Sequence, residues 1–188
     1  MEFDKKGDVL WSQSYGGRQL DEAYHFEHTS DGGYIISGST QSYGFGGSDI
    51  WLIKSGSNGL IEWNTYIGTE YDEQGGQIIQ TEDSGYLVVG NRTHEQREDS
   101  DVWLIKTNSQ GDSTWTKTYG GLGDDIGSDI IQIENNGYIL VGSTKSFEEE
   151  DYDILVVKID DSGNEEWAQS YGIGSNDFGQ AILESRNG

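Results

Sequence analysis

Two residue types are missing from the 188-residue chain, which contains no cysteine and no proline. Without cysteine the chain has no disulfide, no Cys-ligated zinc or iron–sulfur site and no thiol nucleophile. The absence of proline excludes collagen-like and Pro-rich segments. Apolar runs do not exceed four residues, as at 50–53, whereas a helix that spans a bilayer needs ~20. The sequence therefore predicts neither thiol chemistry nor insertion into a membrane.

Basic residues are also scarce. The chain has 11 Lys and Arg against 34 Asp and Glu, which gives a net charge of −23. A strongly acidic surface repels the phosphates of nucleic acids and of anionic membranes, so neither is expected as a partner. High charge with few apolar residues is also found in disordered chains. Aromatic residues make up 12% of this chain, however, and their regular spacing indicates a folded protein.

A repeat of 52 residues runs through the sequence. Trp11, Trp63, Trp115 and Trp167 follow one another at this interval, and many other positions superpose under the same shift. Chance does not explain such agreement, so a repeat architecture is expected. The other matching sets include Gly7, Gly59, Gly111 and Gly163; Gly16, Gly68, Gly120 and Gly172; Tyr34, Tyr86 and Tyr138; Gly38, Gly90 and Gly142; and Lys54, Lys106 and Lys158.

Each repeat contains four short runs rich in β-branched and aromatic residues, separated by turn residues, which is the pattern of strands. We call the predicted strands a to d. In the second repeat they cover 77–81, 86–89, 102–105 and 114–119. We expect the last glycine of each a-to-b turn to be left-handed, as in a tight hairpin, and the same for the glycine of each c-to-d turn. The a-to-b glycines are Gly33, Gly85 and Gly137, and the c-to-d glycines are Gly59, Gly111 and Gly163.

Four antiparallel strands repeated at this length indicate an all-β fold, a β-propeller of four-stranded blades. Three complete blades are expected at about 22–67, 74–119 and 126–171. Residues 8–15 would form strand d of a preceding blade, and 178–188 would begin another. One interpretation is that the chain is a piece of a longer propeller. The other is that it is complete and joins a second copy through its exposed edge strands.

The third repeat carries a specific combination of motifs. It reads Trp115-x3-Tyr119-Gly120-Gly121-x3-Asp125, then Gly137-Tyr138-x3-Gly142-Ser143-Thr144, then Asp153-x4-Lys158-x4-Gly163. This combination resembles the bacterial and archaeal β-propeller repeats of the SBBP type, and the resemblance covers nearly the whole chain. It implies a propeller within a large secreted or surface-attached protein, and it implies no catalytic residues.

Carboxylates recur next to two of the predicted strands. A ring of them around a propeller axis would offer the hard oxygen ligands that calcium prefers, which makes calcium the candidate cofactor. The simpler interpretation is that each carboxylate accepts backbone N–H groups of a turn, and we favour it because residues present in every blade usually serve the blade. The metal candidates lie before strand a, at Asp21, Glu73, Asp125 and Asp177; Asp49, Asp101 and Asp153 lie before strand c.

The loops from strand b to strand c differ between repeats. Variable loops on a repeated scaffold are the usual place for binding specificity. The candidate residues for contact with a partner are Tyr43, Phe45, His94, Arg97, Phe147 and Tyr152. The alternative is that these are merely tolerated loop tips.

The leading hypothesis is a noncatalytic propeller module that presents these loops to a protein or a carbohydrate. A second hypothesis is a propeller hydrolase or lyase that uses an asymmetric pair of carboxylates, with Asp125 and Asp177 as candidates. A third is a structural spacer that associates with itself. The fold class alone does not choose among the three.

Overall fold

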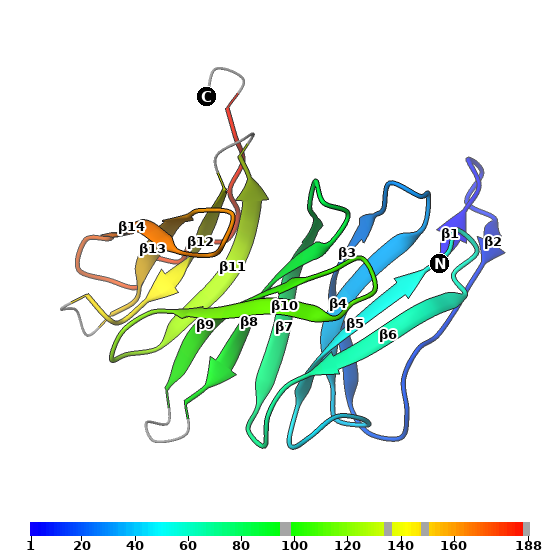
Figure 1. The fold of residues 1–188 in the computed structure, drawn as a ribbon, viewed down its shortest axis with the longest axis horizontal. Helices are drawn as coiled ribbons and strands as arrows, with labels where there is room; N and C mark the ends of the chain where they lie inside the picture. Colours follow the sequence, from blue (N-terminus) through cyan, green and yellow to red (C-terminus); the bar gives the residue numbers. More distant parts are fainter. Residues whose placement is uncertain (95–98, 134–136, 148–150, 186–188) are drawn as a thin grey trace.

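The computed structural model describes residues 1–94, 99–133, 137–147 and 151–185. These residues are built from β-strands and connecting turns, which confirms the all-β class (Figure 1). No helix long and apolar enough to cross a membrane occurs in these ranges. The strands are β1 (Glu2–Phe3), β2 (Val9–Trp11), β3 (Asp21–His28), β4 (Tyr34–Thr40), β5 (Asp49–Ser55), β6 (Ile61–Ile67), β7 (Glu73–Gln80), β8 (Tyr86–Thr93), β9 (Ser100–Thr107), β10 (Ser113–Tyr119), β11 (Asp125–Gln132), β12 (Tyr138–Thr144), β13 (Asp153–Ile159) and β14 (Glu165–Tyr171).

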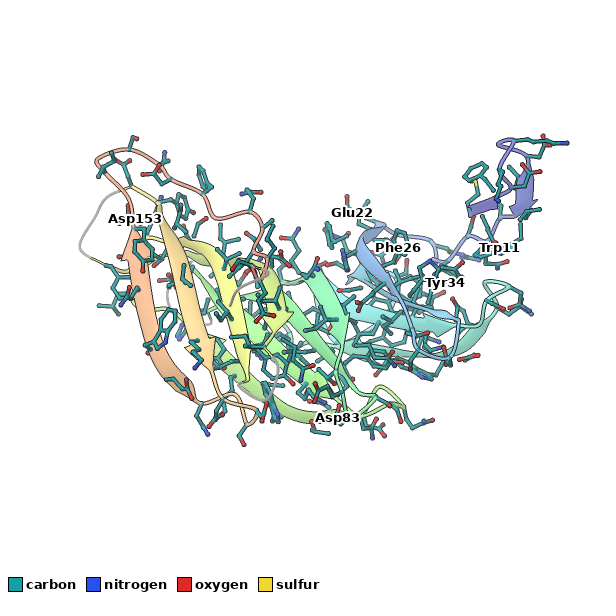
Figure 2. All side chains as sticks on the ribbon, turned by 90° about the horizontal axis from the view of Figure 1, so that it is seen from above. Trp11, Glu22, Phe26, Tyr34, Asp83 and Asp153 are labelled. Carbon is teal, nitrogen blue, oxygen red and sulfur yellow. The ribbon has the colours of Figure 1, made fainter. Side chains whose placement is uncertain are left out.

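The strands pair into three four-stranded antiparallel sheets and one two-stranded hairpin. β3 to β6 form the first sheet, β7 to β10 the second and β11 to β14 the third, each in chain order as strands a to d. The sheets follow one another along an arc and do not close on themselves (Figure 2). Each strand a is bulged near its start, between Ala23 and His25 in the first sheet. The described chain is therefore an open series of similar sheets.

The strand a of the second sheet begins four residues before the expected 77–81, at Glu73. Gly75 and Gly76 weakened the strand signal in the sequence. The structure explains Gly75, because a Cβ there would lie 2.4 Å from the carbonyl oxygen of Gly38 in the first sheet. The glycine thus marks a close approach between two sheets.

The a-to-b turns differ from the expectation in two of the three sheets. The left-handed residue is Gly32 in the first sheet and Ser84 in the second, one position before the expected glycine, whereas Gly137 is left-handed as expected. Gly33 is required for another reason: a Cβ there would lie 2.2 Å from the carbonyl oxygen of Ser55. The c-to-d glycines are all left-handed, with φ between 74° and 84°.

Neighbouring sheets pack face to face. In the second and third sheets, we call the face that is turned toward the preceding sheet the front face and the opposite face the back face. The same names are used for the corresponding faces of the first sheet. The back face of the first sheet and the front face of the second share one apolar core, and the second and third sheets share another. The first core contains Ile35, Ile50 and Leu52 against Ile78, Tyr86, Val88, Trp103 and Ile105; the second contains Leu87, Val89, Val102 and Leu104 against Ile130, Tyr138, Leu140, Leu155, Val157 and Ile159.

The repeated tryptophan joins each sheet to the next. The Trp63 ring, on strand d of the first sheet, covers Gly111 in the c-to-d turn of the second, where a Cβ would lie 2.6 Å from Cζ3 of the indole. Trp63 also packs on Tyr86, with ring centroids 5.7 Å apart. Trp115 covers Gly163 of the third sheet in the same way. The glycine is therefore needed both for its left-handed backbone and for the contact with the next sheet.

The two ends of the described chain make contacts that strands of a neighbouring sheet make elsewhere in the chain. The β1–β2 hairpin has the register of β5–β6, and Trp11 covers Gly59 as Trp63 covers Gly111. At the other end, the Asp177 N–H donates to the Tyr152 carbonyl at 2.6 Å, as Glu73 donates to Ser48 at 2.7 Å. β2 is shorter than the expected strand at 8–15, and 178–185 forms no strand; 186–188 lie outside the described residues.

Candidate functional site

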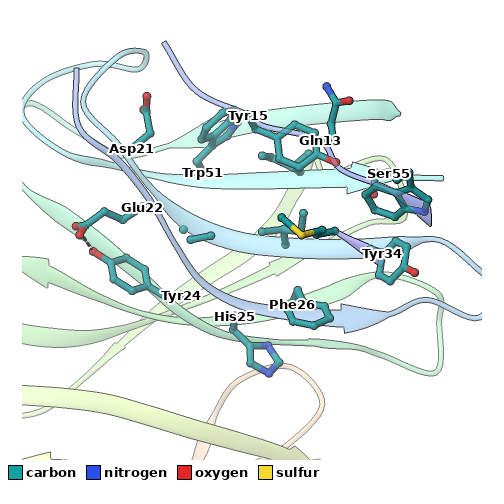
Figure 3. A pocket seen from close by; sticks show the side chains of 16 residues that line it. Gln13, Tyr15, Asp21, Glu22, Tyr24, His25, Phe26, Tyr34, Trp51 and Ser55 are labelled. Carbon is teal, nitrogen blue, oxygen red and sulfur yellow. Dashed lines mark hydrogen bonds between the residues drawn. The ribbon is translucent and has the colours of Figure 1, made fainter. Parts of the chain in front are cut away.

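A pocket of about 340 Å³ opens on the front face of the first sheet (Figure 3). One wall is the N-terminal segment, and the rest comes from β3, β4 and β5. Most of the lining is aromatic or aliphatic, with a few polar residues among it. The lining includes Met1, Trp11, Tyr15, Tyr24, Phe26, Tyr34, Ile36, Trp51 and Ile53, with Gln13, Asp21, Glu22, His25 and Ser55 among the polar residues.

The aromatic rings of this pocket contact one another along its floor. Trp11 meets Tyr34 edge-on at a centroid distance of 6.0 Å, and Phe26 lies 6.4 Å from the same tyrosine (Figures 2 and 3). Phe26 is 62% exposed despite its apolar side chain. At the rim the Tyr24 hydroxyl donates to Glu22 at 3.0 Å. The pocket thus offers an apolar, aromatic surface to whatever enters it.

The pocket-lining residues occupy the repeat positions that are buried in the other two sheets. Tyr34 and Ile36 correspond to Tyr86 and Val88, both of which pack against the back face of the first sheet. The pocket therefore lies at the position where, in the second and third sheets, the back face of the preceding sheet packs. The pocket was not predicted from the sequence, although strand parity and the 52-residue shift place its lining residues on one face of the sheet. The corresponding residues are Phe26, Ile78 and Ile130; Tyr34, Tyr86 and Tyr138; Ile36, Val88 and Leu140; Trp51, Trp103 and Leu155; and Ile53, Ile105 and Val157.

The b-to-c loop of the first sheet presents two of the predicted contact residues. Tyr43 stacks on Tyr66 with ring centroids 5.3 Å apart, and Tyr66 stacks on Trp51 at 6.0 Å. Tyr43 remains 44% exposed and Phe45 70% exposed. Asp49 accepts the Phe45 N–H at 3.0 Å and so fixes the base of the loop. The loop carries an ordered aromatic surface.

The b-to-c loop of the third sheet carries Phe147 and Tyr152. Phe147 is 42% exposed, while Tyr152 packs on Phe178 at a centroid distance of 5.2 Å and lies under the Lys145 ammonium at 4.3 Å. Burial, and then the charge of Asp124, raise the pKa of the Tyr152 hydroxyl. Phe147 is thus open to solvent, and Tyr152 is already engaged.

The middle b-to-c loop is described only in part. The His94 N–H donates to the Asp99 carbonyl at 2.8 Å, and Arg97 lies outside the described residues.

In each sheet these loops lie at the end that also carries the d-to-a connections: Ser42 accepts the Gln19 N–H, and Ser146 accepts the Gly121 N–H, both at 3.0 Å. The predicted contact residues are therefore spread over separate loops at one end of the sheets.

The repeated carboxylates close the d-to-a turns. Asp125 accepts the Gly121 N–H at 2.8 Å and the Ser146 hydroxyl at 2.7 Å. Asp21 makes the matching bonds with Gly17 and Ser42. Glu73 accepts the Thr69 N–H at 2.9 Å, and Asp177 accepts the Ile173 N–H at 3.1 Å. Asp21, Glu73 and Asp125 are the first residues of their strands and do not precede them, whereas no strand follows Asp177 in the described residues. Each of the four carboxylates accepts a backbone N–H of a turn.

Carboxylates also meet in pairs where two sheets join. A Cβ on Gly68 would lie 2.1 Å from Oδ1 of Asp49 and 2.6 Å from Oε2 of Glu73, so the two buried groups face each other across the glycine. Burial raises the pKa of Glu73, the Thr69 hydrogen bonds oppose this, and the charge of Asp49 adds to it. Among the described residues, no group of three or more acidic or histidine side chains is arranged to hold a metal ion.

Two comparisons of the sequence with known proteins were negative. No family model matches the chain, and a search of the curated proteins found no match. The resemblance to the SBBP-type repeats therefore stays a prediction that rests on the motif positions.

Proposed function

We propose that this chain is a noncatalytic β-propeller module of the SBBP-type repeats, and that its b-to-c loops bind a protein or a carbohydrate. The observation that carries the proposal is the exposure of Tyr43, Phe45 and Phe147 on loops that differ from repeat to repeat. The residues that are the same in every repeat serve turns and sheet contacts instead. Specificity is thus assigned to the part of the surface that varies.

The propeller part of the proposal is supported by how the sheets are built and stacked. Each is a four-stranded antiparallel meander, and each packs its front face on the back face of the one before. Propeller blades have this strand number and this packing. The curved course of the three sheets agrees with a blade series (Figure 2).

The aromatic surface at the first loop is suited to flat apolar ligands. Tyr43, Tyr66 and Trp51 form a cluster in which each ring contacts the other two, and Tyr43 is the most exposed of the three. Such a ring covers the C–H face of a sugar or an apolar side chain of a partner at little cost in conformational entropy. Phe45 beside it adds a second exposed ring.

The proposal is tested by probing the purified chain on a glycan array and a protein array, then repeating the assay with Tyr43→Ala/Phe45→Ala. We expect at least about a tenfold loss of binding, because two exposed contact rings are removed. Leu60→Ala is the matched control, since Leu60 is 60% exposed and lies in a c-to-d turn, at the end of the sheet opposite to these loops. Unchanged binding by the double variant would contradict the proposal. Glycoside turnover abolished by Asp125→Asn or Asp177→Asn would favour a hydrolase instead.

A further inference from the structure

Beyond loop recognition, we propose that two copies of this chain associate head to tail. In this arrangement the back face of the third sheet of one copy docks on the front face of the first sheet of the other, in the pocket. The contact would place Ile139, Ile154 and Val156 against Tyr34, Ile36 and Trp51.

The same interface already occurs twice within the chain. Leu52 of the first sheet and Leu104 of the second occupy the same repeat position on the back face, and both are fully buried by the next sheet. Val156 is the third member of this set and is only half-buried. The third sheet thus presents the face that the first two sheets use for packing, without a full sheet to cover it.

The front face of the first sheet is the matching half. Tyr34 and Ile36 are half-buried there, while their counterparts Tyr86 and Val88 are 2% and 0% exposed under the back face of the first sheet. Since the receiving residues in the pocket repeat those of the internal interfaces, the occupant that fits is the back face of another such sheet. A second copy supplies one.

The residues of the repeated tryptophan–glycine contact are present on both docking faces. Trp167 is 38% exposed and Tyr171 53% exposed on β14, and no four-stranded sheet of the described residues packs against them. Within the chain, the Tyr119 hydroxyl donates to the Gly163 carbonyl at 2.7 Å. Docking would let Trp167 and Tyr171 make these contacts with Gly59 of the other copy.

The chain ends now occupy the places that docking would fill. Trp11 covers Gly59, and the Tyr15 hydroxyl donates to its carbonyl at 2.6 Å. The Ile182 N–H donates to Asp129 at 2.9 Å, in the position of the Ile78 bond to His25. Docking therefore exchanges these contacts for equivalent ones, as in domain swapping. The gain comes from filling the pocket, and the displaced β1–β2 hairpin is of a size that is marginal by itself.

A front-to-back contact either closes into a ring or continues as an open series. Two copies would contribute six sheets, which lies within the range of about four to eight blades in closed propellers. The expected species is therefore a dimer of twice 20.8 kDa. Because each copy carries a charge of −23, added salt should strengthen the association.

The first test blocks each face separately in the full chain. Ile36→Lys blocks the front face and Ile154→Lys the back face, and Leu122→Lys is a control away from both. By sedimentation velocity from micromolar to millimolar concentration, we expect dimers for the wild type and the control, and monomers for each blocked variant. An equal mixture of the blocked variants should form dimers again, because one intact front face meets one intact back face.

Three results would overturn the proposal: a monomeric wild type over the whole range, blocked variants that still associate, or a mixture that remains monomeric. Circular dichroism of each variant checks that the fold is retained. If the wild type is monomeric but another β-rich protein fills the pocket, the occupant is not a second copy.

The second test compares two tryptophans at the same repeat position. Trp11→Ala removes a chain-end contact that competes with docking, so it should tighten the dimer. Trp167→Ala removes a contact that docking makes, so it should weaken the dimer by about 30-fold or more. A purely structural role of the two residues would not give changes of opposite sign. Changes of the same sign would contradict the exchange of chain ends.

Discussion

The second sheet is covered on both faces, whereas the first and third sheets each leave one face open. On the second sheet, Val88 and Leu104 point to opposite sides and are both fully buried. Their counterparts Ile36 and Val156 are half-buried, because no four-stranded sheet of the described residues packs beyond them. Two other front-face residues of the first sheet, Trp51 and Ile53, are nevertheless only 7% and 3% exposed. The same repeat positions are thus fully buried in the middle of the series and partly more exposed at its ends, so the neighbouring sheet contributes to their burial.

The largest difference should appear when the same back-face position is truncated in the middle and at the end. Leu104→Ala removes a fully buried side chain and should lower the free energy of unfolding by about 3–4 kcal/mol. Val156→Ala, at the matching position of the third sheet, should cost about 1 kcal/mol or less. Urea denaturation of dilute samples measures both. Equal losses would show that the two positions are covered alike.

The next difference concerns the glycine that receives the tryptophan. Gly111→Ala adds both strain at φ +84° and a clash with the Trp63 ring, and should cost about 2–3 kcal/mol. Gly7→Ala is the matched control: its φ is +88°, but a Cβ there meets nothing within 4 Å, so it should cost about 1 kcal/mol. Thermal unfolding of both variants separates the clash from the strain. If both cost the same, the tryptophan contact does not explain the glycine.

A smaller effect is expected from the tyrosine hydroxyls on strand d. Tyr119→Phe removes a buried donor to the Gly163 carbonyl and should cost about 1 kcal/mol. Tyr171→Phe, on the open third sheet, should change stability by no more than a few tenths, since that ring is 53% exposed. Chemical denaturation of the two variants side by side is the measurement. A larger loss of stability for Tyr171→Phe than for Tyr119→Phe would contradict this, because it would mean that the tyrosine of the third sheet is the buried one.

The smallest effect concerns the repeated lysine, which ties strand c to a turn. Lys106 bonds Asp83 at 2.7 Å. Burial opposes ionisation of Asp83, but bonds from Lys106, Thr81 and the Gly85 N–H lower its pKa to about 2. Its contribution is present above the ordinary value of 3.8 and is lost as pH falls toward 2.

Because the Asp83 side chain is 64% exposed, this contribution should stay below about 1 kcal/mol. The unfolding free energies of wild type and Asp83→Asn should therefore differ at neutral pH and converge between pH 4 and pH 2, in a titration followed by urea denaturation at each pH. A difference that grows toward low pH would contradict the sign of the shift.

The sequence predicted the strands because the repeat fixes their phase. It predicted the left-handed turns at Gly59, Gly111 and Gly163 for a local reason, since the hairpin alone demands them. It placed the start of strand a in the second repeat too late, at 77 and not at Glu73, because Gly75 is there for a contact with the neighbouring sheet and not for the strand. Sequence patterns therefore predicted features that depend on neighbouring residues in the chain, and they failed where a contact with another sheet decides.

The pocket was out of reach of local rules for the same reason. Phe26 and Trp51 belong to different strands, and they line one cavity because, among the described residues, only the N-terminal segment with the β1–β2 hairpin lies over the front face, and no four-stranded sheet does. The loop residues Tyr43 and Phe45 could be predicted from the sequence, because they lie in a loop whose residues differ between repeats. The contacts of the Tyr43 ring with Tyr66 and Trp51 could not be predicted, because they depend on how the loop folds back on the sheet.

Native-state hydrogen exchange of the wild-type chain at low concentration tests most directly whether each sheet is stabilised by its neighbours. We expect the slowest exchange in β8 and β9, which are covered on both sides, and faster exchange in β4 of the first sheet and β13 of the third. Equal protection in all three sheets, or the strongest protection in an outer sheet, would contradict it.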